Sequence, residues 1–403
     1  MVHMAVTADH LLLRYADVGV ATYASLRVVG RPDTTVTWVL DETAMATVQD
    51  LLADALPDPR PRETIADAVE RAVAAGSFAS ASAEQHLAEV LGELLLPEPA
   101  WRLLAAHAAV TDAVLFAAPA ARLAQVPWSI LAMPGDGRRL IELVDILLAA
   151  PPNIANAARR PAPWRPDRAP LFVLDPRVPT QRPDSALGSV LGRPDPDTPV
   201  ARHFAAVMSR REVLPPAGSA VELFRRTEAD RGWLATQLRR EPGRLLYVGH
   251  ATAADGDVGL ADRAAIHLAE AEPLSAGELM AAALPMPARV ALLACASGGD
   301  YRFDEATGLV AALILNGAVL VTATLWSLPT TAGFRRFASA ATESADPMGD
   351  VVVAVDTAHD APEAGRAVNA WQRAQLARWR SGDGTASPLY WAALVTFAVD
   401  GAR

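Results

Sequence analysis

The 403-residue sequence predicts an α/β protein whose mainly parallel sheet is flanked by helices. Three short apolar runs, Leu171–Leu174, Leu245–Val248 and Val290–Ala294, have the length and composition of strands buried on both faces. Helical patterns separate these runs along the chain, and strands that alternate with helices pair in parallel. With 51% hydrophobic residues, the chain can build a large core.

Before residue 151, short β-like runs alternate with longer helical patterns. In Glu84–Leu96 the apolar residues recur every third or fourth position, the spacing of one helix face. The strands expected in this part are Leu11–Leu13, Val36–Leu40 and Ala113–Phe116, and the helices are Ala44–Leu56, Ile65–Ala75 and Glu84–Leu96.

A proline-rich segment separates the two halves of the chain. Six prolines lie between Pro151 and Pro170, a density that favours an extended linker. We therefore predict two domains, one of residues 1–165 and one of residues 166–403.

The second domain is expected to supply the parallel sheet. Ser275 and Glu278 match a capping box, which starts a helix at Ala276, and Gly317 is suited to end the helix before the last expected strand. The other elements expected here are helices at His203–Met208, Val221–Arg225, Asp230–Arg240, Ala276–Leu284 and Glu305–Asn316, and a strand at Val319–Leu325.

The charge balance excludes several classes of partner. The 36 basic residues, all arginine, stand against 46 acidic residues and give a net charge of −10. An acidic chain without a basic run lacks the electrostatic features of a nucleic-acid binder, and it is unsuited to an anionic membrane surface.

Motifs for cofactors, metals and membrane insertion are not found. The single cysteine excludes an intramolecular disulfide and a multi-cysteine metal site. We find no phosphate-binding glycine loop and no metal-ligand spacing, so no cofactor and no metal is expected. No signal peptide and no membrane-spanning run is evident, which predicts a cytoplasmic protein.

Two predicted strands end at reactive side chains. Leu245–Val248 leads through Gly249 to His250, and Val290–Ala294 leads directly to Cys295. Because the carboxyl ends of parallel strands meet at one edge of a sheet, we expect His250 and Cys295 to lie together. A thiol nucleophile needs a base within hydrogen-bond reach and amide donors for the oxyanion. The sequence therefore predicts Cys295 as nucleophile and His250 as its general base.

Structural interpretations of the same residues stay open. A lone cysteine after an apolar strand is more often a small buried hydrophobe, and His250 is alternatively a structural histidine at a strand end. His267, on the short segment Ile266–Leu268, is a candidate for a β-edge residue near the site. The acidic pair Asp304 and Glu305 is suited to cap the following helix and to interact with its dipole.

Several sequence blocks, in this order, resemble the CHAT domain, a bacterial clan of caspase-like peptidases related to separase and caspases. The blocks are VPWSILA at Val126–Ala132, RRLIELVDILLAAPPN at Arg138–Asn153, YVGHA at Tyr247–Ala251, LLACASGG at Leu292–Gly299, DEATGLVAALILNGAVLVTATLW at Asp304–Trp326 and PLYWAALV at Pro388–Val395. The resemblance covers roughly residues 85–400. It implies a caspase-like fold in which residues 1–165 form an α/β pseudo-catalytic or regulatory lobe.

The resemblance also implies roles for individual residues. His250 is the base and Cys295 the nucleophile, and backbone amides of Gly249, Ala251 and Cys295 hold the oxyanion. Trp326 and Ser327 line the substrate cleft, and Asp304 and Glu305 place negative charge beside the pocket for a substrate side chain. This sequence has Ala251 where the family often has glycine, and its Ser327–Thr331 segment lacks the aspartate that the family commonly carries.

The function that follows is hydrolysis of peptide bonds in a protein substrate, as part of bacterial defence or programmed cell death. The resemblance further implies a separately encoded sensor or activator protein. The alternative is a non-catalytic pseudo-protease that serves as a scaffold or interaction module, and a weaker one is an acyltransferase that uses the same pair of residues.

Overall fold

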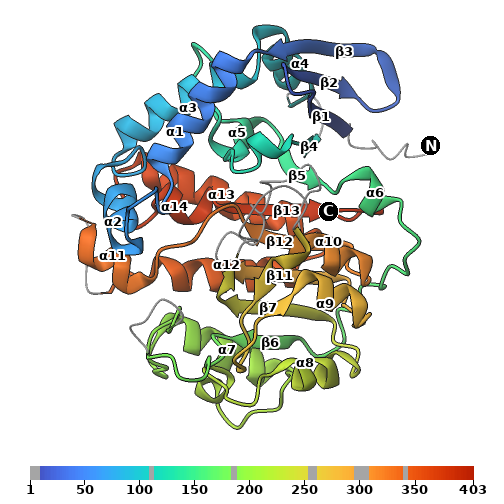
Figure 1. Ribbon diagram of the computed structural model, residues 1–403, viewed down its shortest axis with the longest axis vertical. Helices are drawn as coiled ribbons and strands as arrows, with labels where there is room; N and C mark the ends of the chain where they lie inside the picture. The colour runs from blue at the N-terminus through green and yellow to red at the C-terminus, as the bar shows by residue number, and fades with distance from the viewer. Residues whose placement is uncertain (1–9, 109–112, 183–187, 253–260, 295–307, 339–343) are drawn as a thin grey trace, which may run out of the picture.

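One sheet of ten strands runs through the protein (Figure 1). This computed structural model describes residues 10–108, 113–182, 188–252, 261–294, 308–338 and 344–403. The strand order is β3-β2-β1-β4-β5-β13-β12-β11-β7-β6, and six of the nine pairings in this sheet are parallel. The predicted α/β class with a mainly parallel sheet is therefore confirmed.

The strands of this sheet are β1 (His10–Asp17), β2 (Thr22–Val28), β3 (Arg31–Leu40), β4 (Val114–Ala118), β5 (Asp145–Ala149), β6 (Leu171–Leu174), β7 (Arg244–Gly249), β11 (Arg289–Ala294), β12 (Leu320–Thr324) and β13 (Leu394–Ala398). A small second sheet contains β8 (Ala251–Thr252), β9 (Ala265–Ile266) and β10 (Leu274–Ser275).

Helices flank the large sheet. In the first half they are α1 (Glu42–Ala55), α2 (Ile65–Glu70) with the π-helical turn η1 (Arg71–Ala75), α3 (Ala81–Leu95), α4 (Glu98–Ala108), α5 (Leu140–Leu143) and α6 (Pro152–Ala155). In the second half they are α7 (Pro199–Arg210), α8 (Arg231–Leu238), α9 (Ala276–Ala281), α10 (Gly308–Leu315), α11 (Thr331–Phe337), α12 (Pro347–Asp360), α13 (Ala364–Arg380) and α14 (Pro388–Trp391). Of these, α12 packs against β7 and β11, and α13 against β5 and β13.

Most expected elements are present with small shifts at their ends, and β6 has the expected bounds. The capping box is confirmed, because the Glu278 amide donates to the Ser275 hydroxyl (3.1 Å) and the Ser275 amide to the Glu278 carboxylate (2.9 Å). The helix expected at Val221–Arg225 is wrong: a short 3-10 turn covers Ala220–Leu223, and Arg225 adopts a left-handed φ of 54°. Part of the helix expected from residue 305 lies outside the described residues.

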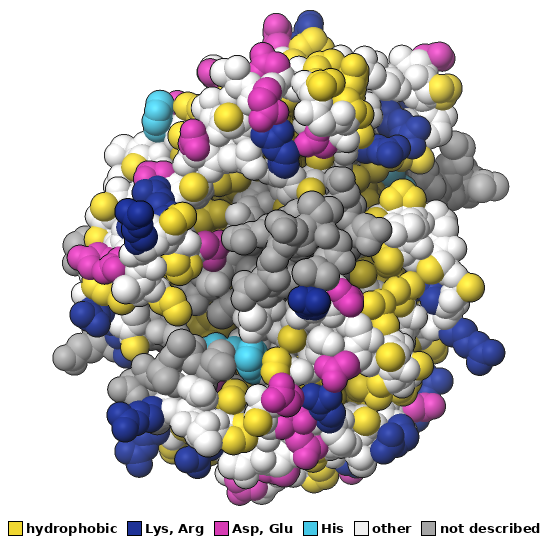
Figure 2. Space-filling view, in the orientation of Figure 1, with side chains coloured by type: hydrophobic (Ala, Val, Ile, Leu, Met, Phe, Trp, Pro, Cys, Tyr) yellow, Lys and Arg dark blue, Asp and Glu magenta, His cyan; other side chains and the backbone are white. Residues whose placement is uncertain are grey.

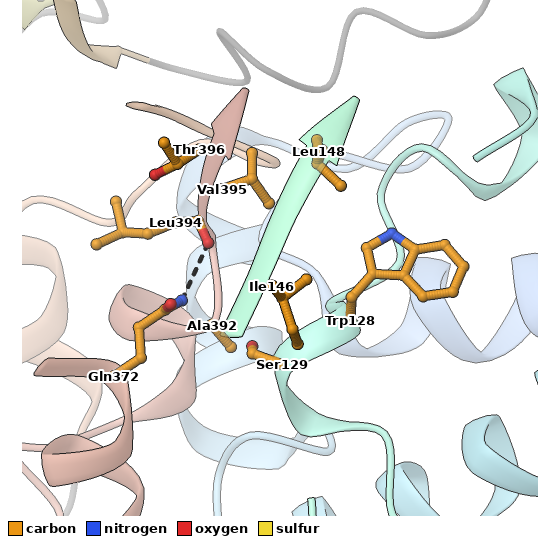
Figure 3. A pocket seen from close by; sticks show the side chains of 9 residues that line it. All are labelled: Trp128, Ser129, Ile146, Leu148, Gln372, Ala392, Leu394, Val395 and Thr396. Atoms are coloured by element: carbon orange, nitrogen blue, oxygen red, sulfur yellow. Dashed lines mark hydrogen bonds between the residues drawn. The ribbon is translucent and has the colours of Figure 1, made fainter. Parts of the chain in front are cut away.

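The strands β5 and β13 join the two halves of the sheet, and side chains of α13 complete the seam between them (Figure 3). Where the strands diverge, the Asn369 side chain accepts from the Ile146 amide (2.6 Å), and Gln372 Nε2 donates to the Leu394 carbonyl (3.0 Å). Buried backbone groups without partners are costly, so these two amide side chains stabilise the seam. Both halves of the chain contribute strands to this one sheet. The division into two domains near residue 165 stays a prediction.

Charged side chains of both signs share the surface. Figure 2 shows acidic and basic side chains interspersed over one face of the molecule. This mixture differs from the continuous basic surface that binds nucleic-acid phosphates. Within the described ranges, no helix is long and apolar enough to cross a membrane.

Candidate active site

Two neighbouring strands, β7 and β11, end side by side at the carboxyl edge of the sheet. They pair in parallel, and the last pair in their register joins Gly249 to Ala294. His250 follows Gly249 in the chain, and Cys295, which follows Ala294, lies outside the described residues. At the end of the next strand, β12, buried Thr324 donates its hydroxyl to the Ala294 carbonyl. This bond fixes the end of β11.

The ring of His250 is buried and is oriented by a backbone carbonyl. The residue is 9% exposed, and its Nε2 lies 3.1 Å from the Gly188 carbonyl oxygen. Because a carbonyl can only accept, Nε2 carries the proton of the neutral ring and Nδ1 carries the lone pair. Nδ1 is therefore the nitrogen able to take a proton from a neighbouring thiol.

Asp175 holds the turn that presents the Gly188 carbonyl. It directly follows β6, is fully buried and adopts a left-handed φ of 50°. Its carboxylate accepts from the Ser189 hydroxyl (2.5 Å) and from the two main-chain amides that follow Ser189. Arg225 joins the groups, since its Nη1 lies 3.0 Å from the Gly188 carbonyl and 3.3 Å from the Asp175 carboxylate. Asp175 and Arg225 together position the carbonyl that orients the histidine ring.

The pKa of His250 is lowered from its ordinary value of 6.5, and burial is the largest cause. The hydrogen bond to Gly188 and the charge of Asp175 raise the pKa, whereas the charge of Arg225 lowers it. The ring is consequently neutral near pH 7, which is the form that accepts a proton in general base catalysis.

A second group of contacts holds the main chain at His250. The Tyr247 hydroxyl lies 2.8 Å from the His250 carbonyl and 2.7 Å from the His267 carbonyl, and the His267 amide donates to the His250 carbonyl (3.0 Å). A Cβ on Gly249 would lie 2.6 Å from the Tyr247 hydroxyl oxygen, far inside van der Waals contact. This packing therefore requires glycine at position 249. His267 lies directly beside the His250 main chain, and its ring nitrogen is hydrogen-bonded to Thr252.

The other predicted site residues occupy different environments. Gly249 closes β7, and Ala251 begins β8, so they flank His250 along the chain. The Trp326 ring is fully buried and stacks on Phe78, with ring centroids 6.0 Å apart, while Ser327 is half-buried. Cys295, Asp304 and Glu305 lie outside the described residues.

Two residues that position His250 are absent from the site that the sequence predicts: Asp175 and Arg225. Asp175 could have been found by the pattern that identified His250, a polar side chain just after a buried strand, because it directly follows the apolar run Leu171–Leu174. The left-handed conformation of Arg225 has no sequence signal, since arginine has no preference for it. Among the described residues, no group of three or more histidine, cysteine, aspartate or glutamate side chains is arranged to hold a metal ion.

The chain matches a known protein family. The family model described as CHAT domain matches residues 85–399, which is more than half of the chain. Among solved structures, the chain is similar to a chain in each of two crystal structures of the Saccharomyces cerevisiae separase–securin complex, with 11% identity and TM-scores of 0.45 and 0.44. Each comparison covers 97% of this chain but only 30% of the other. No curated protein matches the sequence.

Proposed function

Because the chain belongs to the CHAT domain family, we propose that it is a cysteine endopeptidase that hydrolyses peptide bonds of a protein substrate. The observation that carries the proposal is the orientation of His250. Its Nε2 is bound to the Gly188 carbonyl, so the lone pair is on Nδ1, and its strand ends opposite the strand that leads to Cys295. Acyl transfer by a thiol requires a general base that lies next to the thiol and keeps its lone pair on the nitrogen that faces it.

The first step is attack on the substrate carbonyl. His250 Nδ1 takes the proton of the Cys295 thiol, and the thiolate sulfur bonds to the carbonyl carbon. The carbonyl oxygen becomes an oxyanion, which the backbone amides of Gly249, Ala251 and Cys295 stabilise.

The next steps release the two products. When the C–N bond breaks, the imidazolium of His250 gives its proton to the leaving amine, and a thioester remains on Cys295. His250 then takes a proton from water, and the hydroxide adds to the thioester carbonyl. The C–S bond breaks, the imidazolium returns its proton to the leaving thiolate, and the acid and the free Cys295 thiol are released.

The family also supports a biological role. We place the enzyme in bacterial defence or programmed cell death, with a separately encoded protein that activates it. In this proposal residues 1–165 form the regulatory or pseudo-catalytic lobe, and Asp304, Glu305 and Ser327 contribute to substrate recognition, whereas Trp326, predicted to line the cleft, is fully buried against Phe78 and has a structural role.

The test is a comparison of the full chain with its Cys295→Ala variant on a proteome-derived peptide mixture. Sequencing of newly formed N-termini should find a shared cleavage motif with the wild type and none with the variant. A thermal unfolding curve for each protein checks that both are folded. A wild type that produces no more new N-termini than the variant would contradict the proposal and favour the scaffold alternative.

A further inference from the structure

The peptide group between His250 and Ala251 has its carbonyl oxygen fixed inside the protein. The His267 amide donates to the His250 carbonyl (3.0 Å), and the Tyr247 hydroxyl lies 2.8 Å from the same oxygen. The hydroxyl also lies 2.7 Å from the His267 carbonyl oxygen, so it links the two chain segments that meet here. Tyr247 is 2% exposed, which shields these contacts from water.

The fixed carbonyl determines the direction of the Ala251 amide. In a planar trans peptide, the C=O bond and the following N–H bond point in opposite directions. The pairing of β8 with β9 agrees with this direction. Ala251 lies opposite Ile266, and the bond from the His267 amide to the His250 carbonyl lies one residue to the side of that pair. In an antiparallel ladder this arrangement leaves the main-chain groups of Ala251 pointing away from β9.

The amide of Ala251 is therefore available to a ligand. β8 is the edge strand of the small sheet, and the described residues offer the half-buried Ala251 amide no acceptor on its outer side. Main-chain donors shielded from water are nearly always paired, so this amide is suited to an acceptor on a bound molecule. Gly249, two residues earlier, pairs with Ala294, which places the amide beside the end of the strand that leads to Cys295.

We propose, on the basis of the proposed peptidase function, that Tyr247 is a positioning residue whose hydroxyl, through the His250 carbonyl, sets the plane of the following peptide and aims the Ala251 amide at the oxyanion. An oxyanion donor must stand about 2.7–3.1 Å from the position that the charged oxygen will occupy, so a small rotation of the peptide weakens it. The ring of His250 has a separate support, because its Nε2 is bound to the Gly188 carbonyl. Tyr247 thus acts on the stabilisation of the oxyanion and not on the activation of the thiol.

The test removes the hydroxyl in the full chain. On a peptide that carries the wild-type cleavage motif, Tyr247→Phe should lower kcat by roughly 10- to 100-fold with little change in KM, because the oxyanion forms only after the substrate has bound. The loss should stay below the 10²–10³-fold, approximately, that removal of an oxyanion donor costs, since the His267 amide still holds the carbonyl. Alkylation of Cys295 by iodoacetamide forms no oxyanion, so its rate and its pH profile should stay at the wild-type values.

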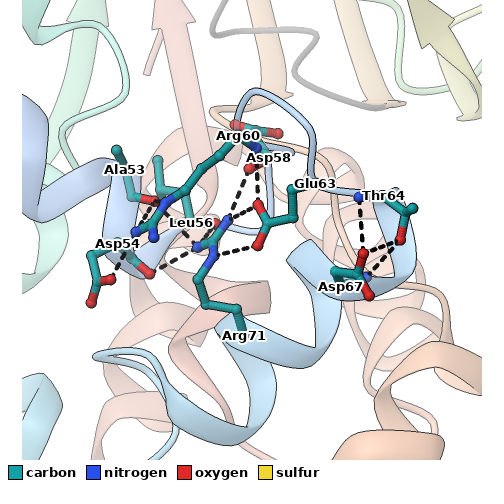
Figure 4. Close-up of polar contacts among 9 residues, drawn as sticks. All are labelled: Ala53, Asp54, Leu56, Asp58, Arg60, Glu63, Thr64, Asp67 and Arg71. Carbon is teal, nitrogen blue, oxygen red and sulfur yellow. Dashed lines mark hydrogen bonds and ion pairs between the residues drawn. The ribbon is translucent and has the colours of Figure 1, made fainter.

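Three further variants control the experiment. With p-aminophenylalanine at position 247, a donor returns to the same place and most of the kcat should be recovered. Tyr15→Phe removes a buried hydroxyl that donates to the Leu95 carbonyl (2.8 Å) in the N-terminal half, and it should keep the wild-type kcat. Arg71→Lys weakens the bonds that Arg71 makes to the main-chain carbonyls of the loop after α1 (Figure 4). It should lower the melting temperature and leave kcat unchanged, which separates loss of stability from loss of positioning.

The outcomes separate this inference from the function on which it rests. A wild-type kcat in Tyr247→Phe, or no recovery with p-aminophenylalanine, overturns the inference and leaves the peptidase function standing. Alkylation that slows in parallel with cleavage also overturns it, because Tyr247 would then position the whole histidine. If the wild type cleaves no more than Cys295→Ala, both fall.

Discussion

The substitution Asp175→Asn should destabilise the protein and lower the pKa of His250 further. The buried carboxylate accepts from the Ser189 hydroxyl and from two main-chain amides, and it pairs with Arg225 at 3.3 Å. Asparagine keeps one acceptor oxygen but loses the charge, so Arg225 is left without its carboxylate. Hydrogen bonds to charged groups contribute about 1.5–3 kcal/mol each, and loss of one partner of a buried ion pair costs about 3–5 kcal/mol.

The expected loss of unfolding free energy is about 2–4 kcal/mol, below the sum of these contributions because the Arg225 side chain is 16% exposed and asparagine retains part of the bonding. The direction in which the pKa of His250 changes in Asp175→Asn follows from charge alone. Asp175 stabilises the protonated ring and Arg225 destabilises it, so removal of the carboxylate lowers the pKa.

Urea denaturation measures the stability, and an NMR titration of the imidazole measures the pKa. The matched control is Asp195→Asn, which changes an exposed aspartate in the same loop. A loss for Asp175→Asn no greater than that of the control, with an unchanged His250 titration, would refute the positioning role of Asp175.

Two further predictions concern charge at buried histidines. Arg225→Gln should raise the pKa of His250, because the charge of Arg225 lowers it. In a profile of kcat/KM against pH, the decline of peptide cleavage on the acid side should then move to higher pH. The control Arg226→Gln, at the neighbouring arginine, should leave this decline at its wild-type pH. Burial lowers the pKa of His359 to about 3. As pH drops below about 6.5, this histidine is protonated in the unfolded chain but stays neutral in the folded protein, so the free energy of unfolding falls. The slope from this one group is about 1.4 kcal/mol per pH unit. His359→Gln should remove that part of the slope in urea denaturation at pH 5 and pH 7, and an unchanged slope would contradict the assignment.

The strands that carry the site could be predicted from sequence because they are buried on both faces. The runs that became β6, β7 and β11 are apolar throughout, as central parallel strands are. The strand β13 has a similar composition but is absent from the prediction. It joins β5 on one side and β12 on the other, and such distant partners leave no local signal.

The contacts around the site are less accessible to sequence reasoning. The group that orients His250 is the main-chain carbonyl of Gly188, which any residue type supplies. Arg225 was expected inside a helix, and the structure instead shows a left-handed residue that reaches this carbonyl. Asp58 meets Ser327 across 269 residues of sequence, and no local pattern marks such a contact.

The central claim, that His250 activates Cys295, is tested most directly by the alkylation rate of the thiol as a function of pH. The chain has a single cysteine, so the uptake of iodoacetamide reports on Cys295 alone. The account predicts rapid alkylation near pH 7 with an apparent pKa below the ordinary value of about 8.5, and a slower reaction with a pKa near 8.5 in His250→Gln. His86→Gln, at an exposed histidine on α3, should behave as the wild type. Equal rates and equal pH profiles for the wild type and His250→Gln would contradict the account.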